Sequence, residues 1–155
     1  MIKVAFNKDQ FKSLVERVLS YIGKHSEDSV NLLLGTCAQE SQFGTYIKQV
    51  KGPALGVFQI EPFTLIDNWE NYLVYHDELS YRIKQCCGVG ESDMFAAESN
   101  LAYQICMARV CYLRKPGAIP IDLKNQAEYW KKNYNTYKGK GTVAEYINNY
   151  NLYVK

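Results

Sequence analysis

The sequence predicts a mainly α protein, a single domain of about seven helices with at most a small β-hairpin. Apolar residues recur at helical spacing along most of the chain, and no alternating pattern predicts a ladder of strands. A chain of 155 residues suits one hydrophobic core, and neither a linker nor an internal repeat divides it. Apolar residues make up 47% and charged residues 22%, which is typical of a folded water-soluble protein.

The first helix is predicted over residues 8–22. Asn7 is a favourable N-cap residue, and Gly23 suits the position just after the helix. Between them, one face carries apolar side chains at helical spacing: Phe11, Leu14, Val15, Val18, Leu19 and Ile22. This face is expected to pack against the core.

The second helix is predicted from Asp28 or Ser29 to Phe43, and Gly44 ends it. Glu40 continues the apolar stripe of this helix, which is formed by Val30, Leu33, Leu34 and Cys37. Burying an unpaired carboxylate is costly unless its pKa rises or a partner is supplied. Glu40 is therefore either a paired or solvated glutamate near a helix end, or a catalytic acid.

The next part of the chain changes pattern. Residues 45–60 contain several turn-forming residues and no helical period, so they predict an ordered loop that can include a short hairpin. Pro62 can open a short helix, because the N–H that proline lacks has no partner in the first turn. Helical residues then run over about 65–86 in two pieces, broken near Asp77.

A long helix is predicted over residues 94–114, after a loop at residues 88–92. Ser92 or Asp93 is expected to cap this helix, since both side chains can accept a hydrogen bond from a free backbone N–H. Pro116 stops the helix, because a proline cannot continue the ladder of backbone hydrogen bonds.

Two more helices are predicted near the end of the chain. Asn125 is expected to cap the first, which runs to about residue 133, and residues 137–141 form a glycine-rich loop. Thr142 and Glu145 have the spacing of a capping box, which opens the last helix. That helix has one apolar face, formed by Val143, Tyr146, Ile147 and Tyr150.

The cysteine pattern favours reduced, mostly buried thiols. The count is odd, two cysteines are adjacent and no C-x-x-C pair occurs, so a disulfide framework is not expected. His25 and His76 are isolated in the sequence, which argues against a zinc site. The cysteines are Cys37, Cys86, Cys87, Cys106 and Cys111. No metal and no other cofactor is expected.

The net charge and the length of the apolar runs limit the kinds of partner that the protein is expected to have. A net charge of +2 is too small to argue for a nucleic-acid partner, and no apolar run approaches the length of a membrane span. The first ten residues, MIKVAFNKDQ, lack the apolar region of a signal peptide. We therefore expect synthesis in a cytoplasm, with any export by another route.

Glu40 and the segment after it form the first candidate site. Burial and helix-terminal carbonyls both disfavour a charged carboxylate in the last turn of an apolar helix, and this favours the raised pKa of a general acid. The loop that follows suits the lining of a cleft. Phe58 and Gln59 come next on a stiff apolar segment, and the Gln59 amide can hold a sugar or amide group.

Two further candidates are weaker. The stretch NYNTYKGKG at residues 133–141 combines aromatic rings, amides and glycines, which suits a glycan groove, although a surface loop can have the same composition. Its lysines, with Lys131 and Lys132, are either an attractor for an anionic polymer or ordinary solvated lysines. Acidic clusters at residues 67–70 and 90–93 offer a second carboxylate for a glycosidase, but helix ends and caps explain them more simply.

Four stretches, in order, resemble the catalytic domain of the lysozyme-like lytic transglycosylases, of the soluble lytic transglycosylase type. They are ESQF at residues 40–43, PALGVFQIEPFT at 53–64, NLAYQICMARVCYL from Asn100, and NYNTYKGKGTVAEY at 133–146. The resemblance covers about residues 31–146 and implies a lysozyme-like fold with a substrate cleft.

The resemblance also implies a reaction, cleavage of the β-1,4 bond between N-acetylmuramic acid and N-acetylglucosamine in peptidoglycan. Glu40 would be the general acid and base. Attack by the sugar's own 6-hydroxyl would make the protein a lytic transglycosylase, and attack by water would make it a muramidase. The residues implied to bind the glycan or to orient Glu40 are Ser41, Phe58, Gln59, Tyr134 and Asn135.

Departures from the family pattern leave a second interpretation open. Pro53 and Phe58 replace a glycine and a methionine of the pattern, and Gln104 and Met107 replace a glycine and an aromatic residue of the later helix. Such changes suit a non-catalytic glycan-binding or structural protein on the same fold, with other virion proteins as partners. A nucleic-acid binder that uses the lysines and tyrosines is a third interpretation.

The expected site of action is the bacterial cell wall, outside the membrane that encloses the cytoplasm. A phage origin would solve the delivery problem, because the protein could travel in the virion or pass through a membrane pore. An excised domain, or a chain from which a signal was removed, would have the same sequence.

Overall fold

The computed structural model describes residues 5–155, and in this part of the chain it contains eight α-helices and no β-strand. The prediction of a mainly α fold is confirmed. The buried apolar side chains form a single core cluster to which every α-helix except α3 contributes at least two residues. No helix within residues 5–155 is both long and apolar enough to cross a membrane.

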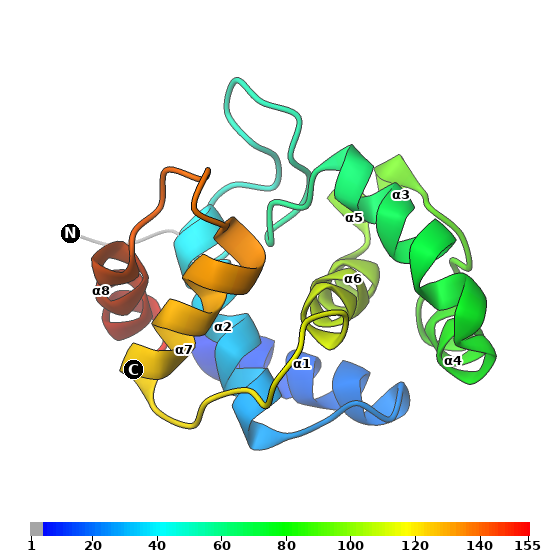
Figure 1. The fold of residues 1–155 in the computed structure, drawn as a ribbon, viewed down its shortest axis with the longest axis horizontal. Helices are drawn as coiled ribbons and strands as arrows, with labels where there is room; N and C mark the ends of the chain where they lie inside the picture. Colours follow the sequence, from blue (N-terminus) through cyan, green and yellow to red (C-terminus); the bar gives the residue numbers. More distant parts are fainter. Residues whose placement is uncertain (1–4) are drawn as a thin grey trace.

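Helix α1 (Lys8–Tyr21) lies beneath the central helix α2 (Glu27–Ser41) in the view of Figure 1. The Asn7 side chain caps α1, as predicted, by accepting hydrogen bonds from the backbone N–H groups of Asp9 and Gln10. Ser26 caps α2 in a reciprocal pair with Ser29, so this helix begins slightly earlier than the sequence predicts. Ser26 satisfies a free backbone N–H and defines the start of the helix.

Helix α2 also ends two residues before the predicted Phe43. Three successive residues after it are left-handed: Gln42, Phe43 and Gly44, with φ values of 50°, 57° and 84°. The Phe43 N–H donates to the Cys37 carbonyl oxygen at 3.1 Å, which closes the helix end. Two non-glycine residues tolerate this conformation because the turn buries the Phe43 ring in the core, edge-on to Phe11 at 5.4 Å.

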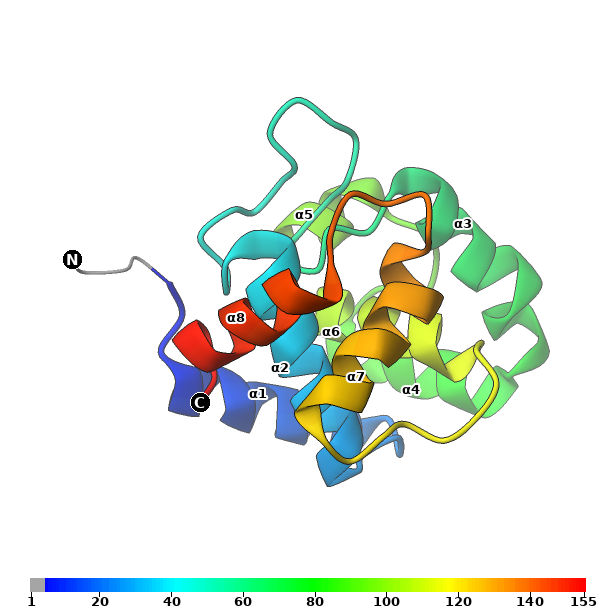
Figure 2. The ribbon, with the colours of Figure 1, turned by 60° about the vertical axis from the view of Figure 1, so that its left-hand side comes forward.

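Residues 42–61 form the predicted ordered loop, which rises above the helices in Figures 1 and 2. The expected hairpin is reduced to two isolated antiparallel bridges, between Lys48 and Leu55 and between Leu55 and Ile60. Helix α3 (Pro62–Asn71) follows and begins at the predicted proline. A short 3₁₀ turn (Leu73–Tyr75) separates it from helix α4 (Asp77–Cys87), which confirms the predicted break.

The predicted long helix over residues 94–114 is instead two helices, α5 (Met94–Ser99) and α6 (Leu101–Leu113). Asn100 interrupts it. The Asn100 side-chain oxygen accepts from the Tyr103 backbone N–H at 3.1 Å, and its Nδ2 donates to the Cys87 carbonyl oxygen at 3.0 Å. Asn100 therefore starts a new helix and ties its start to the end of α4.

Helix α7 (Leu123–Trp130) continues into a single π-helical turn (Lys131–Asn135). Its cap is Asp122 rather than the predicted Asn125, because the Asp122 carboxylate accepts from the Asn125 backbone N–H at 3.2 Å. Helix α8 (Val143–Tyr153) begins with the predicted capping box of Thr142 and Glu145. In Figure 1, α7 and α8 lie on one side of α2 and α6, and α3 and α4 lie on the other.

Candidate active site

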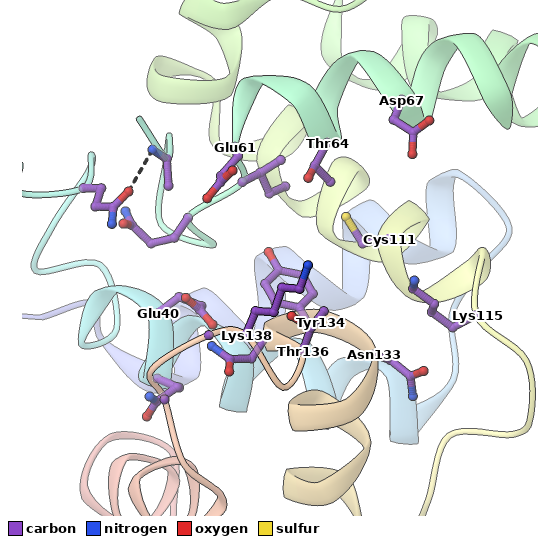
Figure 3. A pocket seen from close by; sticks show the side chains of 18 of the residues that line it. Glu40, Glu61, Thr64, Asp67, Cys111, Lys115, Asn133, Tyr134, Thr136 and Lys138 are labelled. Carbon is purple, nitrogen blue, oxygen red and sulfur yellow. Dashed lines mark hydrogen bonds between the residues drawn. The ribbon is translucent and has the colours of Figure 1, made fainter. Parts of the chain in front are cut away.

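A cleft of about 690 Å³ opens where four separate parts of the chain meet. These parts are the end of α2, helix α3 with the loop that leads into it, the end of α6, and the π-turn with its glycine-rich loop. Figure 3 shows α3 on the upper side of the cleft, with Glu61, Thr64 and Asp67 directed into it, and Glu40 on the lower side. Most of the lining side chains are polar, and many carry an amide.

Glu40 lies in the last turn of α2, partly buried at the edge of this cleft. Burial raises the pKa of its carboxyl group to about 7, because a charge is less favourable away from water. A hydrogen bond from the Trp130 indole Nε1 to Glu40 Oε2, 3.0 Å long, acts in the opposite direction and lowers this pKa. A carboxyl group with a pKa near 7 can both give and take a proton at neutral pH.

Trp130 is a site residue that the sequence reasoning missed. It is the last residue of α7, it is fully buried, and its indole N–H fixes one oxygen of Glu40. The other carboxyl oxygen is left for the cleft. Trp130 lies four residues before Tyr134, which is the spacing of neighbours on one helix face, and this spacing is the signal that the sequence offered.

Gln59 lines the cleft, as expected of a residue that holds substrate. Its backbone is left-handed, with a φ of 52°, and its side-chain Nε2 donates to the Gly56 carbonyl oxygen at 2.9 Å. Left-handed non-glycine residues are uncommon and cluster at functional sites. The side-chain oxygen of Gln59 has no partner among the described hydrogen bonds, so it is available as an acceptor.

Tyr134 also lines the cleft. Its hydroxyl donates to the Phe58 carbonyl oxygen at 2.6 Å, and its ring stacks on Tyr112 with centroids 5.2 Å apart. The first contact joins the π-turn to the segment around Gln59, and the second joins it to α6. The two contacts fix the orientation of Tyr134, which lines the same cleft as Glu40 (Figure 3).

Ser41 and Phe58, which the sequence predicted to bind substrate, do not line the cleft. Ser41 is 1% exposed; its hydroxyl donates to the Cys37 carbonyl oxygen and accepts from the Gly44 backbone N–H. Phe58 is fully buried and packs near Phe11. Both side chains therefore shape the backbone that carries Glu40 and Gln59, and neither reaches the cleft.

Asn135 lines the cleft but also anchors the loop that follows. The ammonium group of Lys131 donates to Asn135 Oδ1 at 2.7 Å and to two backbone carbonyl oxygens, of Gly139 at 3.0 Å and of Gly141 at 2.6 Å. Lys131 is thus an internal clamp rather than a solvated lysine. Lys138 and Lys140 remain on the loop and contribute positive charge to the cleft lining.

Two further carboxylates line the cleft. Asp67, from the first acidic cluster, forms an ion pair of 2.9 Å with Arg114, and that guanidinium group also donates to Asn68. Hydrogen bonds from Asn71 and Arg114 lower the pKa of Asp67, so it stays charged. Glu61, just before α3, faces the cleft from the wall opposite Glu40 and was not among the predicted site residues (Figure 3).

The second acidic cluster lies away from the cleft. Asp93 caps α5 by accepting a hydrogen bond from the Ala96 backbone N–H at 2.9 Å. The simpler of the two interpretations of this cluster, a helix cap, is the correct one for Asp93. Within residues 5–155, no group of three or more His, Cys, Asp or Glu side chains is arranged to hold a metal ion.

Comparison of the chain with protein-family models, with curated proteins and with solved structures found no match.

Proposed function

We propose that the protein cleaves the β-1,4 bond between N-acetylmuramic acid and N-acetylglucosamine in peptidoglycan, with Glu40 as general acid and base. The observation that carries the proposal is the Glu40 carboxyl group, which is partly buried, has a pKa of about 7 and lies on a polar cleft. A general acid works best when its pKa lies near the working pH. The resemblance of four ordered stretches to the lytic transglycosylases points to the same residue.

In the proposed reaction, protonated Glu40 gives its proton to the glycosidic oxygen as the bond to the muramoyl C1 breaks. The positive charge that develops at C1 is stabilised by the muramoyl 2-acetamido group. Glu40, now a carboxylate, takes the proton of the muramoyl 6-hydroxyl, whose oxygen bonds to C1 and closes a 1,6-anhydro ring. Attack by water in place of the 6-hydroxyl gives the muramidase outcome.

The cleft lining supports a sugar as the ligand. Five lining residues that are accessible to solvent carry a side-chain amide, and amides can both donate to and accept from hydroxyl and acetamido groups. They are Gln39, Gln49, Gln59, Asn133 and Asn135. A volume of about 690 Å³ lies in the range that holds a small molecule or a few sugar units. Lys115, Lys138 and Lys140 add positive charge, which suits a polymer that carries carboxylates.

One observation favours the second candidate, a non-catalytic glycan-binding or structural protein. Three groups expected to hold substrate already have partners within the protein: Gln59 Nε2, the Tyr134 hydroxyl and Asn135 Oδ1. In a site that no longer cuts, such groups can form hydrogen bonds within the protein and make the site rigid. In this candidate, the cleft grips the glycan and Glu40 transfers no proton.

The experiment that separates the two candidates is clearance of purified peptidoglycan by the wild-type protein and by the Glu40→Gln variant. The amide keeps the size of the side chain and an oxygen that can accept from Trp130. The proposal expects clearance by the wild type and none by the variant, while both bind the glycan. Binding without clearance by either protein would support the second candidate, and equal clearance by both would remove Glu40 from the reaction.

A further inference from the structure

Three thiols gather where the end of α4 meets α6. Cys86 and Cys87 are the last two residues of α4, and Cys106 lies in the middle of α6. The sulfur atoms of Cys87 and Cys106 are 3.6 Å apart. The remaining cysteines, Cys37 and Cys111, are buried elsewhere and contact a serine and an asparagine rather than another thiol.

We propose that Cys87 and Cys106 are an oxidation site, at which a small-molecule disulfide such as oxidised glutathione converts the two thiols into an intramolecular disulfide that joins α4 to α6. The closeness of the two sulfurs carries the proposal, because they need to approach by only about 1.5 Å to reach bonding distance. The proposal does not depend on the function of the cleft.

The difference in exposure between Cys87 and Cys106 sets the order in which the two thiols react. Cys87 is partly exposed at the end of α4, whereas Cys106 is fully buried, so an oxidant from solution reaches Cys87 first. The Cys87 thiolate attacks one sulfur of oxidised glutathione, forms a mixed disulfide and releases one glutathione thiolate. Cys106 then loses its proton as its sulfur attacks the Cys87 sulfur, which forms the internal disulfide and releases the second glutathione thiolate.

The reaction is balanced in protons and electrons. Two protein thiols are oxidised to one disulfide, one glutathione disulfide is reduced to two glutathione thiols, and the two cysteine protons end on glutathione. The proton of Cys106 leaves to solution as the second bond forms. Hydrogen bonds with the Cys106 and Cys87 thiols hold the pKa of Cys86 below the ordinary thiol value, and the same bonds together with burial hold the pKa of Cys106 above it.

The disulfide would close a loop of 19 residues that contains α5 and the helix-starting Asn100. This part of the chain supports the cleft wall, because the Gln104 side chain accepts from the Val57 backbone N–H at 3.0 Å. Closing such a loop restricts the unfolded chain, so oxidation is expected to raise the Tm by roughly 5–10 °C. Reduction should reverse the rise.

The test treats the full-length reduced protein with excess oxidised glutathione, alkylates the remaining thiols and follows crosslinked protein by mass spectrometry. Wild type should lose two alkylation sites, with a crosslinked peptide that contains Cys106, and its Tm should rise. The Cys86→Ser variant is the matched control and should crosslink within about threefold of the wild-type rate. The Cys87→Ser variant should crosslink at least tenfold more slowly, and circular dichroism checks that both variants fold.

Three results would overturn the proposal. The first is a wild-type protein that keeps all of its thiols available for alkylation. The second is a mixed disulfide with glutathione that accumulates and never engages Cys106. The third is a Cys87→Ser variant that crosslinks as fast as Cys86→Ser, which would assign the bond to Cys86.

Discussion

At the scale of single residues, the proposed chemistry depends on the pKa of the Glu40 carboxyl group, on which two effects act in opposite directions. Burial favours the neutral form of Glu40, and the hydrogen bond from Trp130 favours the charged form. The result is a pKa of about 7, against 4.5 for an unperturbed glutamate. Because the folded pKa is the higher one, the charged form of Glu40 costs the folded state free energy above neutral pH.

The Glu40→Gln variant should therefore be more stable than wild type at pH 8, by about 1–3 kcal/mol. The free-energy cost of a charged Glu40 in the folded state is absent below the unfolded pKa of about 4.5. It grows as the pH rises to about 7 and is complete above that pH, so its removal stabilises the variant only at high pH. Urea unfolding at pH 8 and at pH 4 measures this difference. A gain in the free energy of unfolding that is the same at both pH values would contradict the assigned pKa.

The Trp130→Phe variant tests the other influence on Glu40. Loss of the indole N–H removes a hydrogen bond that favours the carboxylate, so the pKa of Glu40 should rise further. Since the acid must be protonated to act, the alkaline limb of kcat/KM should move up by about one pH unit. A pH–rate profile measures this shift. A limb that moves down would show that the hydrogen bond does not act on Glu40 as described.

Glu61 provides the test of how the sugar is attacked. It faces the cleft opposite Glu40, so it is the candidate base for a water molecule in a muramidase reaction (Figure 3). If the sugar's own 6-hydroxyl is the nucleophile, Glu61→Gln should keep kcat within about tenfold of wild type, because no second base is needed. A loss of kcat of about a thousandfold or more would assign a catalytic role to Glu61 and favour hydrolysis.

The sequence singled out Glu40 because a carboxylate continues an apolar stripe, and it singled out Gln59 and Tyr134 through the resemblance; all three line the cleft. It placed Ser41 and Phe58 in the cleft, although both are buried behind it. Neighbours of a functional residue in the sequence point in different directions, and only the left-handed turn after α2 decides which of them face the cleft. The Trp130 partner of Glu40 is 90 residues away, and no local pattern links the two.

At the scale of helices and loops, capping residues predicted most of the boundaries. Asn7, Pro62 and the Thr142–Glu145 box mark helix starts in the sequence and in the structure. The break at Asn100 was missed, since apolar residues continue at helical spacing through it. A tertiary hydrogen bond from the Asn100 amide to the Cys87 carbonyl oxygen favours a break over a continuous helix. The spacing of apolar residues does not reveal this bond.

The loop that carries Gln59 packs closely against α5 at Gly56. A methyl group at this position would lie 2.3 Å from the Ala97 carbonyl oxygen, and the backbone there has a φ of +76°. We expect Gly56→Ala to lower the free energy of unfolding by roughly 3 kcal/mol or more, because strain and a backbone clash act together.

The matched control for this loop is Gly88→Ala. Gly88 has nearly the same φ, +77°, but nothing lies within 4 Å of the added methyl group. This variant should lose only about 1–2 kcal/mol, the cost of a left-handed alanine. Chemical unfolding of both variants measures the difference. Equal losses of free energy of unfolding in the two variants would show that α5 does not pack tightly against the loop at Gly56.

At the scale of the whole molecule, the cleft is a product of the fold rather than of any one stretch. Glu40 comes from α2, its indole partner from α7, and the opposing carboxylates from the loop before α3 and from α3. Cationic side chains come from the end of α6 and from the glycine-rich loop. Figures 1 and 2 show these elements around one central pair of helices, α2 and α6. The sequence predicts these elements separately, whereas their convergence on one cleft is a property of the tertiary structure.

The central claim is that this cleft cuts peptidoglycan by proton transfer through Glu40. The most direct measurement is mass spectrometry of soluble products after purified peptidoglycan is incubated with the wild-type protein and with Glu40→Gln. We expect muropeptides that end in 1,6-anhydro-N-acetylmuramic acid from the wild type, and none from the variant. Peptidoglycan that yields no soluble product with the wild type, or the same products with both proteins, would contradict it.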